Sequence, residues 1–529
     1  MKLTDVISGS PATLMEILDA RSRRAERQKE LLSGTENGCL ISFSLNIAGA
    51  IKRFPLALMA FDTGLSEIRG RLKRETKAKI LHFEERRPIT GPEAMFLLEA
   101  KPQDVKRAMT AIEEVHPLGR LFDIDVLGAD GIPLSRSQFG LPARACLVCG
   151  ENAKACARGR VHTIEMVLWC TAKLLDDYFC GQAADLAASC AVKALLYEVS
   201  ATPKPGLVDR NNSGSHRDMD FFTFVDSSAA LIPWFRDFFC IGWAHAKETE
   251  EQLFLRLRFA GSRAEADMMA ATGGVNTHKG LVFAFAVVCG ALGKAAALQI
   301  ERGDASPDDE KEPADGRRDT DGAFRRSPLS ADIVLDICRK LGTCSLGDFA
   351  GQNAARAAEN HADGRPAQGG ETADSSQMTP GLKFQASYGI SGARGEAAAG
   401  FPSALRFGLP ALKKWRSTGL SLNDSAALSL LAILAEVDDT NMIHRGGKEE
   451  AARRKEEAAR LLSDVTRETF GETLTELDRS YIQGNLSPGG CADLLAVSLM
   501  FYFLEECGLT DDFGTFQPTA SVLPDTKSR

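Results

Sequence analysis

The pattern of hydrophobic and polar positions divides the chain into two parts of different character. Before about residue 175, short runs of β-branched and aromatic residues alternate with helix-like segments. An amphipathic, Arg-rich pattern predicts a helix over residues 11–32, and a second helix is expected over 103–115. Strands are expected at CLISFSLNI (39–47), near residues 80–84 and in RLFDIDVL (120–127), with a hairpin turn at GADG (128–131). The first third of the chain is therefore predicted to be α+β.

From about residue 163 onward, Ala- and Leu-rich helical periodicity dominates. It continues to residue 199 and returns at residues 227–246, 281–299, 331–342, 426–435 and 491–504. The apolar run that begins at Leu281 stops at Lys294, which is too short to cross a bilayer and favours a buried helix. The second part is therefore predicted to be nearly all-α, with no membrane segment.

Two segments of the helical part are charged, rich in Gly, Pro and Ser, and poor in apolar residues: 302–328 and 361–379. Such segments cannot bury enough apolar surface to become ordered, so they are predicted to be disordered surface insertions. The predicted division is a domain over 1–178, a helical domain over 179–515 and a tail over 516–529.

Length and charge support two modules. A chain of 529 residues is too long for one ordinary core. Its net charge of −8 argues against general nucleic-acid binding. Residues 1–175 hold 26 Lys and Arg against 21 Asp and Glu, a net of +5, so the remainder holds 37 against 50, a net of −13. This asymmetry suggests modules with different partners.

The thirteen cysteines are scattered, and many lie in apolar helix-like runs, which indicates reduced thiols in the cytoplasm rather than a disulfide framework. One group differs. CLVCGENAKACARGRVH contains Cys146, Cys149, Cys156 and His162, a set of residues suited to tetrahedral zinc. The alternative is a group of buried free thiols.

The first third also contains a pair of carboxylates. Asp123 and Asp125 are two apart in a predicted strand, so both point to one face. Paired carboxylates suit Mg²⁺ that bridges to substrate phosphates, whereas the alternative is two solvated acids. Lys52, in the loop NIAGAIKRFP, and Arg120, the first residue of the carboxylate strand, are candidate phosphate contacts or ordinary surface cations.

In the helical part, the segment TPKPGLVDRNNSGSHRDMDFF (202–222) directly follows an apolar helix. Its prolines prevent helix continuation, and Gly206 permits close backbone approach. The candidate phosphate-binding cations are Lys204 and Arg210, and the candidate metal-binding or catalytic groups are Asp209, His216 and Asp218. A hydrogen-bonded loop histidine is the alternative for His216.

Four more glycine-containing polar islands interrupt the apolar helices. ATGGVNTHKG lies just before a buried helix, YGISGARGEAAAGFP is expected to form a Gly-rich turn, EVDDTNMIHRGG to end an apolar helix, and NLSPGG to precede the last helix. Each could be a capped helix end, but five such islands suggest helix ends gathered around a polyphosphate and its metal. Their candidate residues are Asn276, His278, Lys279, Arg394, Glu396, Asp438, Asp439 (the last two also as metal ligands), Asn441, Arg445, Asn485 and Ser487.

The motifs of the first third, NIAGAIK, TGPEAM, IEEVHPLGRLFDIDVL and CLVCGENAKACARGRVH, resemble the citrate lyase holo-acyl-carrier-protein synthase family over about residues 10–175. That family is also called apo-citrate lyase phosphoribosyl-dephospho-CoA transferase. One departure is Ala48 and Ala50, where the family usually has prolines. The resemblance implies a nucleotidyltransferase-like domain that transfers a nucleotide-like group to a serine of the lyase's acyl carrier subunit and releases pyrophosphate, with Mg²⁺ on Asp123 and Asp125. The basic charge would suit an acidic carrier.

The five islands, in order, resemble the triphosphoribosyl-dephospho-CoA synthase family over about residues 180–505. This implies that ATP and 3′-dephospho-CoA give 2′-(5″-triphosphoribosyl)-3′-dephospho-CoA and adenine. Lys204, Arg210, Lys279 and Mg²⁺ on Asp209 or Asp439 would then hold the phosphates, and a carboxylate or His216 would act as general base. The remaining alternatives are the equivalent malonate decarboxylase pathway and a non-catalytic ATP-binding regulator.

Overall fold

The computed structural model describes residues 6–35, 38–76, 78–302, 328–362 and 392–515. The chain forms two compact units, one of Met1–Gly181 and Leu298–Ser327, the other of Gln182–Ala297 and Pro328–Arg529. The predicted disordered insertions lie outside the described residues, except for their first or last residues: Arg302 ends one helix, and residues 361–362 end another. The tail over 516–529 also lies outside them.

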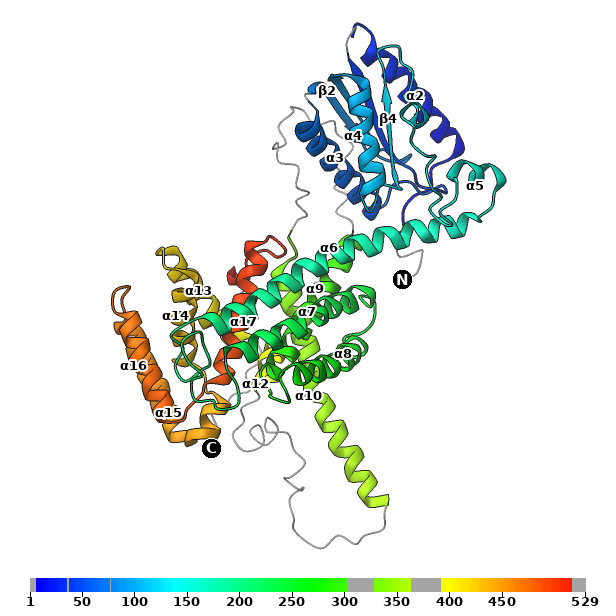
Figure 1. The fold of residues 1–529 in the computed structure, drawn as a ribbon. Helices are drawn as coiled ribbons and strands as arrows, with labels where there is room; N and C mark the ends of the chain where they lie inside the picture. Colours follow the sequence, from blue (N-terminus) through cyan, green and yellow to red (C-terminus); the bar gives the residue numbers. More distant parts are fainter. Residues whose placement is uncertain (1–5, 36–37, 77, 303–327, 363–391, 516–529) are drawn as a thin grey trace. The chain divides into compact units, whose positions relative to one another are not determined.

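The first unit is an α/β fold around a four-stranded antiparallel sheet in the order β2-β3-β1-β4 (Figure 1). The predicted helices and strands are present. A fourth strand, β3, begins inside TGPEAM, which was expected to be a loop; residues 90–92 of this motif precede the strand. The elements are α2 (Leu14–Leu32), β1 (Cys39–Leu45), α3 (Pro55–Glu75), β2 (Lys79–Arg86), β3 (Glu93–Glu99), α4 (Pro102–Val115), β4 (Phe122–Leu127), a 3₁₀ turn (Arg136–Phe139) and α5 (Ala153–Gly159).

The two faces of the sheet differ because side chains alternate along each strand. Phe43 and Phe122 lie on the face that α3 covers, and Phe43 stacks on Phe61 with ring centroids 4.9 Å apart. On the opposite face, the strand register places Asp125 beside Ser42 and Asp123 beside Ser44. The sheet therefore presents hydroxyls and carboxylates together on one face.

β4 is an edge strand, and α4 satisfies its free backbone groups. The buried Lys106 donates from Nζ to the Ile124 carbonyl over 3.1 Å, and the Ile124 amide donates to Glu113 Oε1 over 3.1 Å. Arg136 in turn pairs with Glu113 at 3.0 Å. Because the edge of β4 is closed in this way, the strand is held firmly where its two carboxylates project.

The described part of the second unit is helical, as predicted, and contains no strand. Its most buried helices are α9, α14 and α17. The helices are α6 (Ile164–Ser200, shared with the first unit), α7 (Phe221–Ala244), α8 (Glu250–Ala271), α9 (Lys279–Arg302), α10 (Ala331–Ala362), α12 (Gly392–Ala399), α13 (Leu409–Ser417), α14 (Leu422–Leu434), α15 (Thr440–Asp464), α16 (Phe470–Gln483) and α17 (Gly489–Glu506).

Two predicted details of the islands are wrong. Arg394 and Glu396 lie on helix α12 rather than in a turn. Asp439 begins α15 instead of ending α14, which already stops at Leu434. The helix α15 was not predicted, because its polar and charged sequence lacks a continuous apolar stripe.

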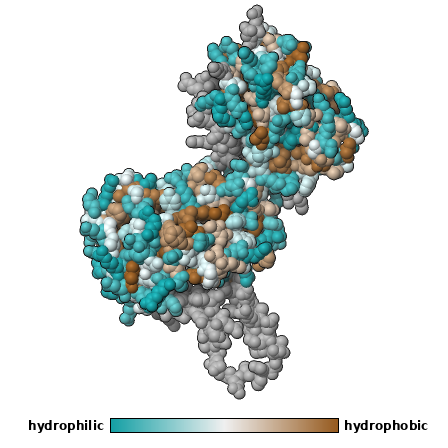
Figure 2. All heavy atoms as spheres, in the orientation of Figure 1, coloured by the Kyte–Doolittle hydropathy of each residue, from teal (hydrophilic) through white to brown (hydrophobic). Residues whose placement is uncertain are grey.

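The helix α9 is also longer than its apolar run. The helix continues past Lys294 to Arg302. The Lys294 ammonium is buried and donates to the Glu248 carbonyl over 2.7 Å. By length and composition both α6 and α9 could cross a membrane, but 56% and 83% of their apolar windows are buried inside the protein, as in core helices. Figure 2 shows hydrophobic residues on the helical unit as a strip among hydrophilic ones.

Candidate functional site

The loop after α6 folds around the carboxylate of Asp209. Asp209 Oδ2 accepts hydrogen bonds from the Thr202 hydroxyl (2.6 Å) and the Lys204 amide (3.1 Å). Its Oδ1 accepts from the amides of Asn211 (2.7 Å) and Asn212 (3.0 Å). Both oxygens of this buried side chain are therefore engaged in shaping the loop.

The same loop is bound to α16 and to the turn that follows it. The Gly206 amide donates to Asp478 Oδ1 over 2.9 Å, and the Ser215 hydroxyl donates to the Leu486 carbonyl over 2.6 Å. Gly206 has a φ of +69°, and a Cβ there would lie 2.2 Å from the Leu486 carbonyl oxygen. The predicted close backbone approach is therefore real, and Asp478, which the sequence analysis missed, anchors it.

His216 lies at the meeting point of three islands. Its Nε2 is 2.8 Å from the Ser487 hydroxyl, and its Nδ1 is 3.5 Å from Arg445 Nη2. Arg445 also donates to the Ser215 carbonyl over 3.0 Å. Asp218, 65% exposed, is 3.8 Å from His216. Burial and then the charge of Arg445 lower the pKa of His216, so the neutral imidazole is favoured.

Asp439 joins the starts of two helices. It accepts hydrogen bonds from the amides of Asn441 (2.8 Å), Met442 (3.0 Å) and, in α17, Cys491 (2.7 Å). Burial raises its pKa, and these amides oppose the shift. Asp438 is different, because it is 62% exposed and forms an ion pair with Lys455 at 2.9 Å.

A second carboxylate group lies where the starts of α9 and α17 meet. A Cβ on Gly280 would lie 2.2 Å from Asp493 Oδ2, so these helix starts are in contact. Burial, then the charges of Glu198 and Asp439, raise the pKa of Asp493 well above its ordinary value. Glu198 pairs with Lys204, and both are buried. Among the described residues, none hydrogen-bonds to the Asp493 carboxylate, although the side chain keeps partial solvent exposure.

His278 has one ring nitrogen in use and one without a partner. The Thr277 hydroxyl donates to Ser227 over 2.7 Å, which leaves the Ser227 hydroxyl hydrogen for His278 Nδ1, 2.7 Å away. Nε2 then carries the proton, and no hydrogen-bond partner for it exists in the described part of the chain. Burial lowers the pKa of His278 to about 3, with a further contribution from Lys204. The result is a neutral, buried N–H donor without an acceptor.

This burial predicts a pH effect on stability. Folded His278 stays neutral, whereas in the unfolded chain it protonates below about pH 6.5, so stability is lost as pH falls from 6.5 towards 3. Relative to His278→Gln, the native chain should lose about 1.4 kcal/mol of unfolding free energy between about pH 7.5 and 5.5. Denaturant titrations at both pH values, followed by tryptophan fluorescence, measure this. Equal changes in both proteins would contradict a buried neutral imidazole.

The other candidates of this unit lie nearer the periphery or are already paired. Lys279 is 60% exposed and pairs with Glu265 at 3.2 Å. Glu396 accepts a hydrogen bond from the Ser403 amide over 3.1 Å. Three further hydrogen bonds run from the Lys279 amide to Asn276 Oδ1 (3.3 Å), from Arg210 to the Ser200 carbonyl (2.6 Å) and from Arg445 to Asn485 Oδ1 (3.4 Å). The Arg394 guanidinium lies over the Phe283 ring, 5.6 Å from its centroid.

In the first unit, the two strand carboxylates share a face but not their surroundings. Asp123 is 3.5 Å from Arg144, whereas Asp125 is exposed and has no hydrogen-bond or ion-pair partner among the described residues. Partial desolvation by the atoms around the carboxylate, and then the charge of Asp123, raise the pKa of Asp125. Asp125 therefore has both oxygens available.

Cations lie around these carboxylates. Arg144, which the sequence analysis did not single out, donates from Nη2 to the Gly119 carbonyl over 3.0 Å. Burial and then the charge of Arg144 lower the pKa of Arg120, so these two cations are neighbours. Lys52 donates to the Ile47 carbonyl, and burial, then Arg21, lower its pKa.

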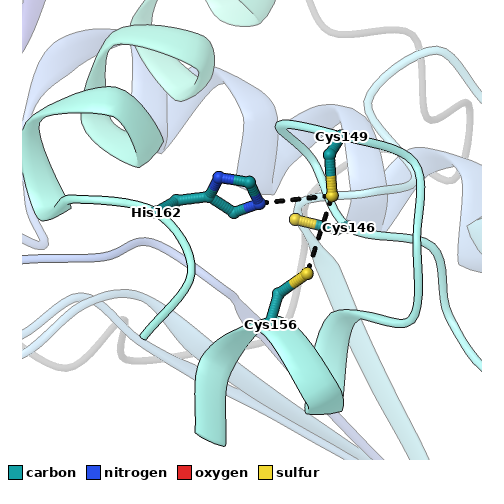
Figure 3. A group of neighbouring side chains, drawn as sticks. All are labelled: Cys146, Cys149, Cys156 and His162. Atoms are coloured by element: carbon teal, nitrogen blue, oxygen red, sulfur yellow. Dashed lines mark hydrogen bonds between the residues drawn. The ribbon is translucent and has the colours of Figure 1, made fainter. Parts of the chain in front are cut away.

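The structure brings Cys146, Cys149, Cys156 and His162 together (Figure 3). One ligand atom from each lies within 4.8 Å of all the others. Cys149 Sγ is 3.6 Å from Cys156 Sγ and 3.2 Å from His162 Nε2. No disulfide joins any of the described cysteines.

Comparison with known proteins agrees with both resemblances. Residues 184–511 match the family described as ATP:dephospho-CoA triphosphoribosyl transferase, and residues 12–178 match that described as apo-citrate lyase phosphoribosyl-dephospho-CoA transferase. Protein CitXG of Haemophilus influenzae is 33% identical over 500 residues, which cover 93% of this chain and 96% of that protein.

Two further relatives extend this result. Protein CitXG of Leuconostoc mesenteroides subsp. cremoris is 31% identical over 502 residues, covering 93% of this chain and 97% of that protein. A probable 2-(5″-triphosphoribosyl)-3′-dephosphocoenzyme-A synthase of Streptococcus mutans is 37% identical over 317 residues, covering 60% of this chain and 95% of that protein. The chain therefore belongs to the family of CitXG fusion proteins, in which an apo-citrate lyase phosphoribosyl-dephospho-CoA transferase is joined to an ATP:dephospho-CoA triphosphoribosyl transferase.

Proposed function

We propose that this bifunctional transferase makes the citrate lyase prosthetic group and attaches it to the lyase's acyl carrier subunit. Residues 179–515 convert ATP and 3′-dephospho-CoA to 2′-(5″-triphosphoribosyl)-3′-dephospho-CoA and adenine. Residues 1–178 then transfer the phosphoribosyl-dephospho-CoA group to a carrier serine and release pyrophosphate. The observation that supports the first step most strongly is the contact between polar islands that are hundreds of residues apart in sequence.

In the first step, the dephospho-CoA ribose hydroxyl forms a C–O bond to the anomeric carbon of ATP while the bond to adenine breaks. The hydroxyl proton is lost and one proton is gained by adenine, so the reaction balances. Asp493 is the candidate proton acceptor, because its carboxylate lies where the starts of α9 and α17 meet and no described residue hydrogen-bonds to it. Negative charge beside the anomeric carbon would also stabilise an oxocarbenium-like transition state.

The structure suggests a division between groups that contact substrate and groups that hold the site together. His278 offers a buried N–H for an acceptor on the substrate. Arg210 and Arg445, exposed at the loop, are candidates for the triphosphate, whose Mg²⁺ is part of the substrate. Asp209 and Asp439 are assigned to positioning, because hydrogen-bond donors already occupy their oxygens.

The second step is assigned to the carboxylate face of the sheet, used in a nucleotidyltransferase-like way. Asp123 and Asp125 fit Mg²⁺, since both project from one strand face and Asp125 has unused oxygens. When bound, Mg²⁺ would stabilise negative charge on the leaving pyrophosphate. Arg120 and Arg144 lie beside this face and would bind phosphate oxygens. Lys52 donates a hydrogen bond to the Ile47 backbone carbonyl and would bind phosphate only at the edge of this group of cations and carboxylates.

The proposal is tested by incubating the full chain with apo-carrier, ATP, Mg²⁺ and dephospho-CoA. We expect mass spectrometry of the carrier to show one added phosphoribosyl-dephospho-CoA group, together with free adenine. Adenine without carrier modification would restrict the chain to the first step. Absence of both products would favour a non-catalytic ATP-binding regulator. Modification of a malonate decarboxylase carrier, without modification of the citrate lyase carrier, would assign the chain to the malonate decarboxylase pathway.

A further inference from the structure

The segment that follows β4 lacks a hydrophobic core of its own. From residue 131 to residue 170, Cys156 is the single buried side chain. The segment nevertheless has a defined path, with a 3₁₀ turn, the short helix α5 and an antiparallel bridge between Ala145 and Asn152. Segments this poor in buried apolar area are commonly held by a metal or by disulfides, and its cysteines are free thiols.

The ligand atoms of the four side chains in Figure 3 lie within 4.8 Å of one another, close enough to share one metal ion. Zinc bonds sulfur at about 2.3 Å, which places two thiolates of a tetrahedron about 3.8 Å apart. The Cys149–Cys156 separation is 3.6 Å, and the His162 ring directs Nε2 at Cys149 Sγ over 3.2 Å. The side chains point toward one common centre although they come from a turn, a helix and a following loop.

The backbone around Cys146 is also arranged for a thiolate ligand. The Val148 amide donates to Cys146 Sγ over 3.4 Å, and the Gly150 amide donates to the Cys146 carbonyl over 3.0 Å. Gly150 has a φ of +78°, which lets the chain turn back directly after Cys149. Amides that point at sulfur stabilise its anionic form, the form in which a cysteine binds metal.

We propose that Cys146, Cys149, Cys156 and His162 bind one structural zinc ion that fixes the segment beside the carboxylate face. Four protein ligands fill a tetrahedron and leave no position for substrate, so the ion is structural rather than catalytic. A Cys149–Cys156 disulfide is the competing use of these thiols, and it requires an oxidant.

The zinc centre would position Arg144, two residues before Cys146. The Arg144 carbonyl accepts from the Ala153 amide over 2.9 Å, so its backbone is bound to the start of α5. Its side chain bonds the Gly119 carbonyl and lies 3.5 Å from Asp123. Loss of zinc should therefore displace a cation from the carboxylates. This positioning role rests on the proposed second step, whereas zinc binding itself does not.

The direct test is metal analysis of the full chain purified under reducing conditions with zinc supplied. We expect about one zinc per chain, and visible bands of tetrahedral cobalt–thiolate after replacement by cobalt. Cys149→Ser and His162→Ala should each lose most of the metal. Cys170→Ser, outside the cluster on α6, is the matched control and should keep it. A chain without stoichiometric zinc, or equal zinc in Cys149→Ser and Cys170→Ser, would overturn the proposal.

The positioning role has a separate test. Chain stripped of zinc, freed of chelator and given Mg²⁺ should modify carrier from purified precursor at least about 10-fold more slowly, a typical effect of losing a supporting contact. It should still release adenine, and zinc should restore carrier modification. Arg144→Ala should show the same loss with zinc still bound. Full carrier modification by zinc-free chain would overturn the positioning role, whereas inactivity of untreated chain would contradict the proposed second step instead.

Discussion

Replacing Asp493 by Asn should lower adenine release from ATP and dephospho-CoA by about 10²–10⁴-fold, the range typical of a general base. The amide cannot take the hydroxyl proton and supplies no negative charge near the anomeric carbon. Asp493 lies in the contact between α9 and α17, and no described residue hydrogen-bonds to its carboxylate, so the variant breaks no hydrogen bond in that part of the chain. The measurement is the initial rate of adenine formation, followed by chromatography.

Two comparisons make this result interpretable. Asp185→Asn changes a surface acid, 64% exposed and paired with Arg236, and should retain the native rate. Asp439→Asn should lose both adenine release and thermal stability, since three amides depend on that side chain. Both Asp493→Asn and Asp439→Asn should still modify carrier when precursor is supplied. Native adenine release by Asp493→Asn would exclude it as the base.

Replacing Asp125 by Asn should slow carrier modification from purified precursor by at least about 100-fold, because several kcal/mol of charge stabilisation by Mg²⁺ are lost. Asp125 is exposed on the sheet and no described residue pairs with its oxygens, so folding should be little affected. The measurement is mass spectrometry of carrier over time at several Mg²⁺ concentrations, and the variant should need more Mg²⁺ than the native chain.

Adenine release is the internal control for this variant and should not change. Asp104→Asn, on the surface of α4 with a side chain 57% exposed, is the matched substitution and should modify carrier normally. If Asp125→Asn stops adenine release as well, the assignment of one reaction to each unit is wrong.

Much of the architecture could be predicted because local patterns determined it. The alternation of side-chain types along the chain predicted β1 and β4, and apolar residues at helical spacing predicted α6, α9 and α17. The strand β3 was not predicted, since its first residues belong to the motif TGPEAM, which was expected to be a loop. Helices such as α15 and α16 were missed, because each buries only four side chains and much of the rest of its sequence is polar.

The contact between islands could also be anticipated, whereas the use of each side chain could not. Lys204 was expected to meet phosphate, yet its charge is balanced by Glu198, an acid inside an apolar helix. Asp209 was expected to bind metal, yet loop amides fill its oxygens. Pairing of this kind depends on which helix ends meet, and no local pattern encodes it. An acid inside an apolar stretch of a helix was the available signal for Glu198 and Asp493.

The central claim is that the joined islands of the helical unit form one site that breaks the sugar–base bond of ATP and leaves the triphosphate intact. The most direct measurement is product analysis after incubating the full chain with ATP, labelled in the base and the γ-phosphate, and dephospho-CoA. We predict that the base label appears as free adenine while the γ-phosphate label appears on dephospho-CoA in equal amount. Formation of ADP, AMP or free phosphate in place of adenine would contradict the account.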